Sequence, residues 1–154
     1  MKCLSLRQPW ASLVASGRKT VEVRSWRTHY RGPLVICASA RPRYPPLPTG
    51  VAVCVVELID VRPLTAADLP AACLDPIDPE GLFAWLLRGA IPLPQPFGPI
   101  RGRLKLFDPP EALRTLCGRL LAAHTAEATP AVARRTSPKA KSSRHADGKC
   151  GRSA

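Results

Sequence analysis

The sequence predicts a mainly β fold of the α+β class: a small β-barrel with one short helix near its start and a second helix after it. Three observations support this prediction. Five or six short runs rich in Val, Ile and Leu are separated by turn residues, as in small β-barrels. The chain contains 18 prolines, which disfavour long helices through its middle. No strand–helix alternation repeats along its 154 residues, so a parallel α/β sheet is not expected.

The first 24 residues predict a strand, a helix and a second strand. Residues 2–6 alternate between apolar and polar side chains, which indicates a short strand. The helix at residues 9–16 begins at a proline, which is well tolerated in a first helical turn, and Gly17 is expected to end it. Residues 21–24 alternate valine with charged residues, which is the pattern of a half-buried strand.

The middle of the chain predicts further strands and one short helix. Residues 34–39 are apolar enough to be buried on both faces of a sheet, and residues 51–61 form the longest β-like run. A short helix with a variant of the capping box at its start is expected at residues 65–69. Two later strands, separated by a proline-rich segment, are expected at residues 82–87 and 101–107.

The composition divides the chain into three parts: a domain at residues 1–108, an amphipathic helix at 109–124 and a basic tail at 125–154. The helix is predicted because leucines recur on one helical face after a Pro-Pro pair. The tail consists mostly of Ala, Thr, Ser, Pro, Lys and Arg. Such a segment cannot bury enough apolar surface to offset its ordering entropy, so we expect it to be disordered.

The net charge of +12 is concentrated at the two ends of the chain. Residues 1–45 contain nine Lys or Arg and one acidic residue, whereas residues 46–123 contain seven and eight. Residues 124–154 again contain seven basic residues, with only two acidic ones. This distribution predicts a basic face and a basic tail that bind an acidic partner, and RNA or single-stranded DNA is the partner we expect.

The cysteine pattern predicts a cytoplasmic protein with reduced thiols. The six cysteines show no CxxC spacing and no histidine at a metal-ligand distance, so neither a metal nor another cofactor is expected. No secretory segment opens the sequence, and no run of ~18 apolar residues is present, so we expect no membrane association.

Residues 7–31 combine basic, aromatic and hydrogen-bonding side chains. Guanidinium and ammonium groups pair with phosphate, indoles stack on bases, and Gln or Glu can contact base edges. On a strand, side chains two apart share a face, so Glu22, Arg24 and Trp26 should line one wall of a cleft. The alternative, that the tryptophans only fill the core, stays open. The candidate nucleic-acid-binding residues are Arg7, Gln8, Trp10, Lys19, Glu22, Arg24, Trp26 and Arg31.

The segments LSLRQPWASLVASG, RKTVEVRSW and YRGPLVICASA, in this order, resemble the ASCH domain, a relative of the PUA RNA-binding fold. The chain is most similar to the ASCH domain of activating signal cointegrator proteins, and the resemblance covers roughly the first 108 residues. It implies a PUA-like barrel with the first helix at its mouth. It also places six of the candidate residues in the motif that lines the cleft between helix and barrel, namely Gln8, Trp10, Lys19, Glu22, Arg24 and Trp26.

The resemblance leaves two alternatives to a binding module. Some small bacterial ASCH proteins are similar to N4-acetylcytidine amidohydrolases, whose lysine in an RKT-type segment matches Lys19. Glu22 stands where those enzymes carry threonine, so the catalytic set is not reproduced, and Lys19 and Glu22 are the only catalytic candidates apart from a carboxylate at Glu80. We therefore favour a binding module over an enzyme. The other alternative is a monomeric protein-interaction module of a transcription or translation coregulator, docking through the C-terminal helix.

Overall fold

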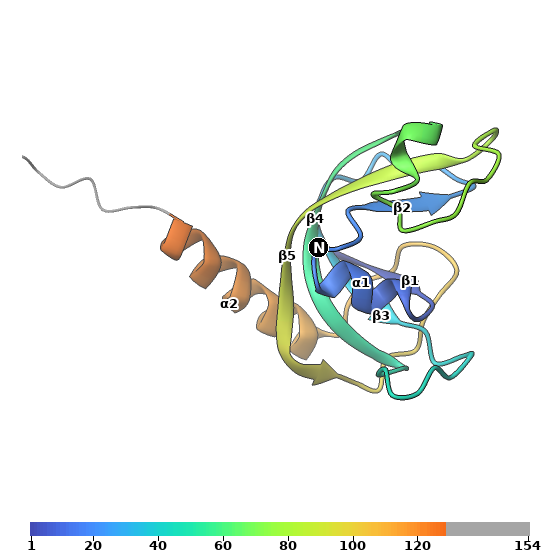
Figure 1. The fold of residues 1–154 in the computed structure, drawn as a ribbon. Helices are drawn as coiled ribbons and strands as arrows, with labels where there is room; N and C mark the ends of the chain where they lie inside the picture. Colours follow the sequence, from blue (N-terminus) through green and yellow to red (C-terminus); the bar gives the residue numbers. More distant parts are fainter. Residues whose placement is uncertain (129–154) are drawn as a thin grey trace, which may run out of the picture.

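The structure, a computed structural model, describes residues 1–128 and is mainly β (Figure 1). The expected tail therefore lies outside the described residues from residue 129 onward. The elements, in chain order, are β1 (Lys2–Leu6), α1 (Trp10–Ala15), β2 (Val21–Arg24), β3 (Gly32–Ala38), β4 (Val51–Pro63), the 3-10 helix η1 (Ala66–Asp68), β5 (Phe83–Phe97) and α2 (Glu111–Ala128).

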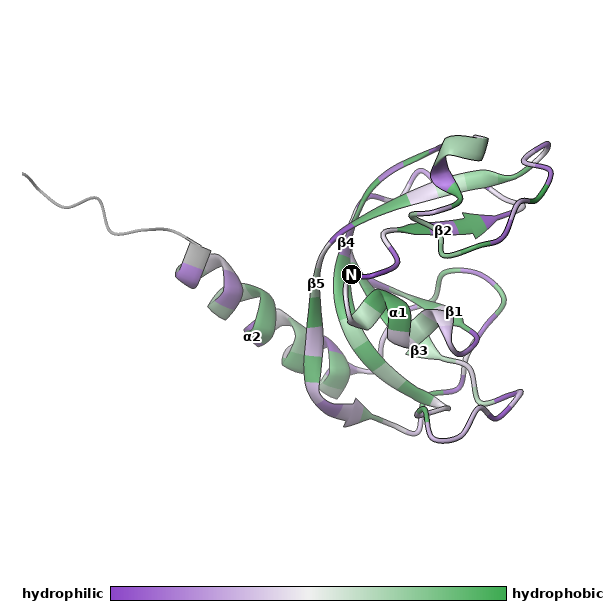
Figure 2. Cartoon of the chain, in the orientation of Figure 1, coloured by the Kyte–Doolittle hydropathy of each residue, from purple (hydrophilic) through white to green (hydrophobic). Residues whose placement is uncertain are grey.

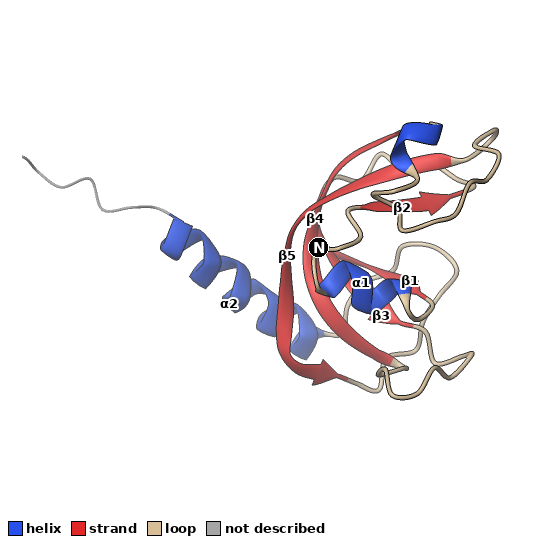
Figure 3. Ribbon diagram, viewed as in Figure 1, coloured by secondary structure: helices blue, strands red, loops and turns tan. Residues whose placement is uncertain are grey.

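The strands form one sheet in the order β1-β3-β4-β5-β2. β1 and β3 are parallel, and all the other pairs are antiparallel. Three register shifts interrupt the pairing of β4 with β5, and such bulges bend and twist a sheet. The sheet consequently curls into an open half-barrel, with α1 inside the curl and α2 outside it (Figures 1 and 3).

Both faces of the sheet are buried, as the apolar run of β3 predicted. Leu34 and Ile36 point into the curl and belong to the same core cluster as Val14 of α1. The alternate residue Val35 points outward and belongs to a second cluster with Leu113 of α2. Figure 2 shows this distribution as mainly apolar strands, with much of the hydrophilic colour in the surrounding loops. The two helices thus cover opposite faces of one sheet.

The short helix η1 has the predicted capping box. The Thr65 backbone N–H donates to the Asp68 carboxylate at 2.9 Å, and the Thr65 hydroxyl donates to the same carboxylate oxygen at 2.7 Å. Arg62 holds that carboxylate from the other side with two hydrogen bonds of 2.8 and 2.6 Å. These charge-assisted bonds fix the segment that follows β4.

Two predicted elements ended too early. β5 continues through the proline-rich segment to Phe97. β2 pairs only with the first residues of β5, so one side of the remaining strand is an edge. A proline without an N–H can face this edge without breaking a ladder of hydrogen bonds, and the strand is therefore not interrupted. The C-terminal helix likewise continues past residue 124 to Ala128.

The strand predicted at residues 101–107 is wrong. Only an isolated bridge forms, in which Cys3 and Phe107 exchange backbone hydrogen bonds of 2.7 and 3.2 Å. The Ser5 carbonyl, the next one on that edge of β1, instead accepts a hydrogen bond from the Arg24 guanidinium at 2.8 Å. Residues 101–106 therefore form a loop, since the edge they would need is already occupied.

Candidate nucleic-acid interface

A cavity of about 610 Å³ opens beside the two edge strands of the half-barrel, β1 and β2. Its volume lies within the ~300–1,000 Å³ usual for small-molecule sites. The β1–α1 and β2 sides contribute Ser5, Leu6, Arg7, Trp10, Lys19, Glu22, Val23 and Arg24. Loops contribute Ser39, Arg41, Leu74, Arg103 and Leu104. The cavity thus contains five basic side chains and one acidic side chain.

Arg24 bridges the two edge strands. Its Nη2 donates to the Ser5 carbonyl of β1 at 2.8 Å, and its Nε lies 3.1 Å from Glu22 Oε1 within β2. An unpaired strand edge presents free backbone acceptors, and this guanidinium satisfies one of them. Arg24 therefore holds the wall of the cavity together, and only part of its hydrogen-bonding capacity remains for a ligand.

Lys19 and Glu22 form a buried ion pair in the cavity wall. Lys19 is 2% exposed and Glu22 7%, and Lys19 Nζ lies 3.4 Å from Glu22 Oε2. The Lys19 ammonium also donates to the Ala72 carbonyl at 2.6 Å. Burial lowers the pKa of Lys19, although Glu22 opposes the shift, and burial raises the pKa of Glu22 against the pull of Lys19 and Arg24.

Among residues 1–128, Glu22 is the sole carboxylate that lines this cavity. Its two oxygens face Lys19 and Arg24 at 3.4 and 3.1 Å, and an ionised carboxylate has more acceptor positions than these two contacts use. The remaining positions can accept N–H donors of a ligand. A cationic wall that carries one acceptor suits a ligand with both negative charge and N–H groups, such as a nucleotide.

Three exposed arginines surround the mouth of the cavity: Arg7 after β1, Arg41 after β3 and Arg103 in the loop before α2. Guanidinium groups bind phosphate oxygens through two parallel hydrogen bonds. Trp10, half-buried at the start of α1, adds an aromatic ring to the same cavity. Phosphate-binding and base-stacking groups therefore occur together at one site.

The Ser5 hydroxyl is buried in the cavity wall without a hydrogen-bond partner. Buried polar atoms usually have a partner, so such an atom is available to a ligand or to water. The backbone of Gly102 lies close to this hydroxyl, since a Cβ added at Gly102 would be 2.6 Å from Ser5 Oγ. The loop of residues 101–106 thus packs tightly against β1 beside the cavity.

Five of the eight predicted binding residues line the cavity, namely Arg7, Trp10, Lys19, Glu22 and Arg24. Gln8 does not. It is buried, its Nε2 donates to the Pro48 carbonyl at 2.8 Å, and its Oε1 accepts the Ser12 N–H at 3.1 Å. Each end of the amide makes one of these bonds, so Gln8 ties α1 to the loop before β4, and it is buried outside the cavity lining.

Trp26 is also outside the cavity. β2 ends at Arg24, so the two-residue alternation that places Glu22 and Arg24 on the cavity side does not extend to Trp26. The Trp26 ring packs edge-to-face on the buried Trp85, with ring centroids 4.6 Å apart. The Trp85 indole N–H donates to the Trp26 carbonyl at 3.2 Å. This tryptophan contacts the core instead of the cleft.

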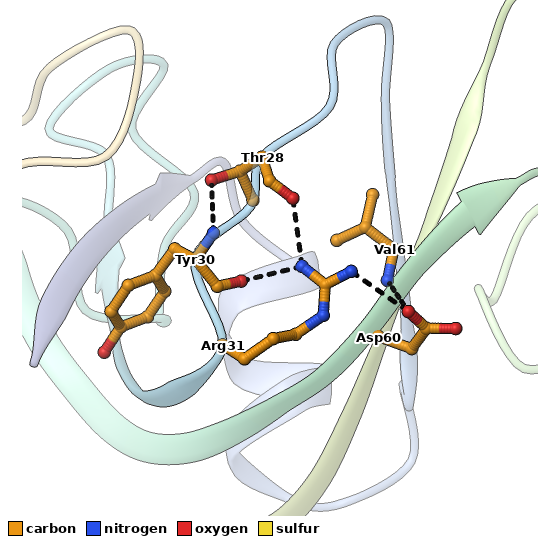
Figure 4. A network of polar contacts seen from close by, with 5 residues as sticks. All are labelled: Thr28, Tyr30, Arg31, Asp60 and Val61. Carbon is orange, nitrogen blue, oxygen red and sulfur yellow. Dashed lines mark hydrogen bonds and ion pairs between the residues drawn. The ribbon is translucent and has the colours of Figure 1, made fainter.

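Arg31 takes part in a separate surface network (Figure 4). Its guanidinium donates to the carbonyls of Thr28 and Tyr30 at 2.9 and 2.8 Å and to Asp60 at 3.0 Å. Asp60 also accepts the Val61 N–H at 2.8 Å. The network joins the β2–β3 connection to β4, away from the cavity residues.

Sequence reasoning missed the loop residues of the site. Arg41 and Arg103 belong to short basic segments, RPR and RGRLK, whose local charge could have pointed to them. Ser5 and Ser39 carried no such indication. Glu80, the other candidate carboxylate, lines a different pocket together with Phe83, so it does not join Lys19.

Within residues 1–128, no group of three or more His, Cys, Asp or Glu side chains is arranged to hold a metal ion. In the same range, no helix combines the length and apolar composition needed to cross a lipid bilayer.

Comparison with known families and sequences identifies relatives. The family model of the ASCH domain matches residues 4–83, more than half of the chain. Activating signal cointegrator 1 from Homo sapiens is 56% identical over 43 residues, which are 28% of this chain and 7% of that protein. The Mus musculus protein is 56% identical over 39 residues, covering 25% and 7%. The chain thus matches only a small fraction of the length of these relatives.

Solved structures show the same fold. The crystal structure of ASCH from Zymomonas mobilis superposes with a TM-score of 0.56 at 18% identity, covering 79% of this chain and 93% of that one. A mutant form of the same bacterial protein gives a TM-score of 0.55 at 16% identity. At such identities the likeness concerns the fold alone.

Proposed function

This chain belongs to the ASCH domain family, and we propose that it binds RNA or single-stranded DNA through the cavity between β1 and β2. The observation that carries the proposal is the composition of the cavity: five basic side chains, one aromatic ring and one buried carboxylate around a volume of about 610 Å³. PUA-like folds are often linked to RNA binding, which supports the same conclusion.

The exposed arginines at the mouth are the proposed phosphate contacts. Arg7, Arg41 and Arg103 carry no ion pair among the described residues, so no internal partner competes with phosphate. Such contacts position a nucleic acid without reading its sequence. A base held in the cavity would stack on Trp10, and its N–H groups would face Glu22. Adenine, cytosine and guanine can donate an exocyclic amino group to this carboxylate, and uracil and thymine can donate their ring N3–H.

Salt-dependent binding tests the proposal. A fluorescent oligouridine or oligothymidine should bind the full chain at low salt, with an affinity that falls linearly on a log–log plot against salt. Arg41→Ala and Arg103→Ala should each reduce that slope by about one, because each removes one phosphate contact. Arg119→Ala removes the same charge from the exposed surface of α2 and serves as the matched control. Equal losses in all three variants would show that only net charge matters, and no binding at low salt would refute the proposal.

One observation favours a second candidate, a nucleoside amidohydrolase. Lys19 is buried beside the cavity and its pKa is lowered, and a lysine needs a lowered pKa to act as a base or nucleophile. Incubation with an acetylated cytidine nucleoside, followed by chromatography, should then release acetate in the wild type and not in Lys19→Gln. No acetate release in the wild type rules this candidate out. If the protein also fails to bind nucleic acid, a protein-interaction module becomes the better explanation.

A further inference from the structure

The loop of residues 101–106 carries a leucine in an unusual setting. Leu104 is 94% exposed, whereas the other exposed large apolar side chains among residues 1–128, Tyr44, Ile59 and Ile77, are 39–46% exposed. A single exposed leucine is common on protein surfaces. This one, however, lies between Arg103 and Lys105 and lines the same cavity as the site described above.

The loop that carries Leu104 is attached at both ends. The Ile100 N–H donates to the Gly50 carbonyl at 2.8 Å, and Phe107 exchanges hydrogen bonds with Cys3 of β1. Between these anchors, the backbone of Gly102 packs on Ser5 so closely that a Cβ at residue 102 would lie 2.6 Å from Ser5 Oγ. The backbone is therefore held against the edge of β1, and Leu104 stands beside the cavity with its side chain in solvent.

We propose that Leu104 is a wedge that enters a base stack when one nucleotide is drawn into the cavity. The inference rests on the proposed function and deepens it: the preferred ligand is a stacked nucleic acid, such as a hairpin with an unpaired nucleotide in its stem. Leucine is among the apolar side chains that nucleic-acid-binding proteins insert between base steps. An extruded base requires a pocket, and the cavity lies directly beside this side chain.

The charges around Leu104 favour nucleic acid over an apolar protein surface as the occupant. Arg103 and Lys105 flank the leucine in sequence, and neither makes an ion pair among the described residues. A side chain inserted between two bases has a backbone phosphate on either side of it. Two cations next to an apolar tip complement that arrangement, whereas a protein hydrophobic groove would leave them without counter-ions.

The test uses RNA and DNA hairpins that carry one unpaired nucleotide and a 2-aminopurine next to it in the stem, whose fluorescence rises when the neighbouring base leaves the stack. Saturating wild-type protein should raise the fluorescence with at least one of the two hairpins. Leu104→Ala should abolish the rise and weaken hairpin binding about tenfold, because unstacking a base is unfavourable and the wedge offsets part of that cost. The same variant should lose clearly less affinity for an unstructured oligouridine or oligothymidine than for the hairpin, because no stack has to be opened there. Leu104→Met, which keeps an apolar tip, should retain both properties.

Ile59→Ala is the matched control, because Ile59 is an exposed apolar residue of β4 that is not part of the cavity lining. It should leave hairpin binding and fluorescence unchanged. If wild type binds the unstructured strands but raises no fluorescence, or if Leu104→Ala behaves as wild type, the wedge is refuted and the proposed function stands. If neither the strands nor the hairpins bind, both proposals fail.

Discussion

Replacing each of two tryptophans by alanine should separate the stability of the domain from its binding. Trp26 packs edge-to-face on the buried Trp85, and this half-buried residue packs against the main core cluster. Truncating a fully buried tryptophan costs about 3–5 kcal/mol, and an aromatic pair adds about 0.5–1.5 kcal/mol to area burial. Because Trp26 is only half-buried, we expect Trp26→Ala to lower the free energy of unfolding by about 2–4 kcal/mol.

Trp10→Ala should show the opposite pattern. Trp10 lines the cavity and is not part of the clusters that form the core, so its removal should cost no more than about 1 kcal/mol of stability, the usual size for a substitution outside a core. Loss of a stacked base is worth about 1–3 kcal/mol of binding free energy, which corresponds to roughly 5- to 150-fold in affinity.

The assay is urea unfolding of each variant, together with oligonucleotide titration of the same samples under conditions where both variants are folded. Trp26→Phe is the control that keeps an aromatic edge, and it should recover most of the lost stability. The reasoning would be refuted by a Trp26→Ala protein of wild-type stability and weakened binding. A strongly destabilised Trp10→Ala protein whose folded fraction binds normally would refute it equally.

Three further predictions concern the loop, the ion pair and the thiols. Gly102→Ala should destabilise the domain by about 1–3 kcal/mol, because the added Cβ would clash with Ser5. Gly118→Ala in α2, where nothing lies within 4 Å of an added Cβ, should instead stabilise it by about 0.5–1 kcal/mol. Urea unfolding measures both changes. Burial raises the folded-state pKa of the Glu22 carboxyl above its ordinary 4.5, so the folded protein holds this proton more tightly than the unfolded chain does. The free energy of unfolding should therefore fall as pH rises from 4.5 toward the raised pKa. Glu22→Gln should remove this component from unfolding curves collected between pH 4.5 and 7. Cys73 is partly exposed and should be alkylated first among the cysteines of residues 1–128. Cys54 is buried and its pKa is raised to about 12, so it should react only when the protein unfolds. Mass spectrometry of the labelled peptides measures both.

Much of the fold follows from local patterns in the sequence. The alternation of residues 21–24, the apolar run of β3 and the capping box at Thr65 each involve neighbours along the chain, and the structure confirms all three. Family membership could also be predicted from the sequence, because it depends on residue identities in a continuous segment. These features need no knowledge of which segments meet in space.

The composition of the site was decided by tertiary structure. Glu22 and Arg24 line the cavity because they share a strand, but Trp26 follows the end of that strand and turns to Trp85, 59 residues away. Arg103 joins the site because its loop crosses to β1, and the same loop failed to become a strand because Arg24 already bonds the Ser5 carbonyl. Hydrophobic periodicity reports which face of an element is buried, whereas these long-range contacts depend on how the half-barrel closes. The sequence alone therefore determined the elements and the family, and only the folded sheet determined which charged side chains surround one cavity.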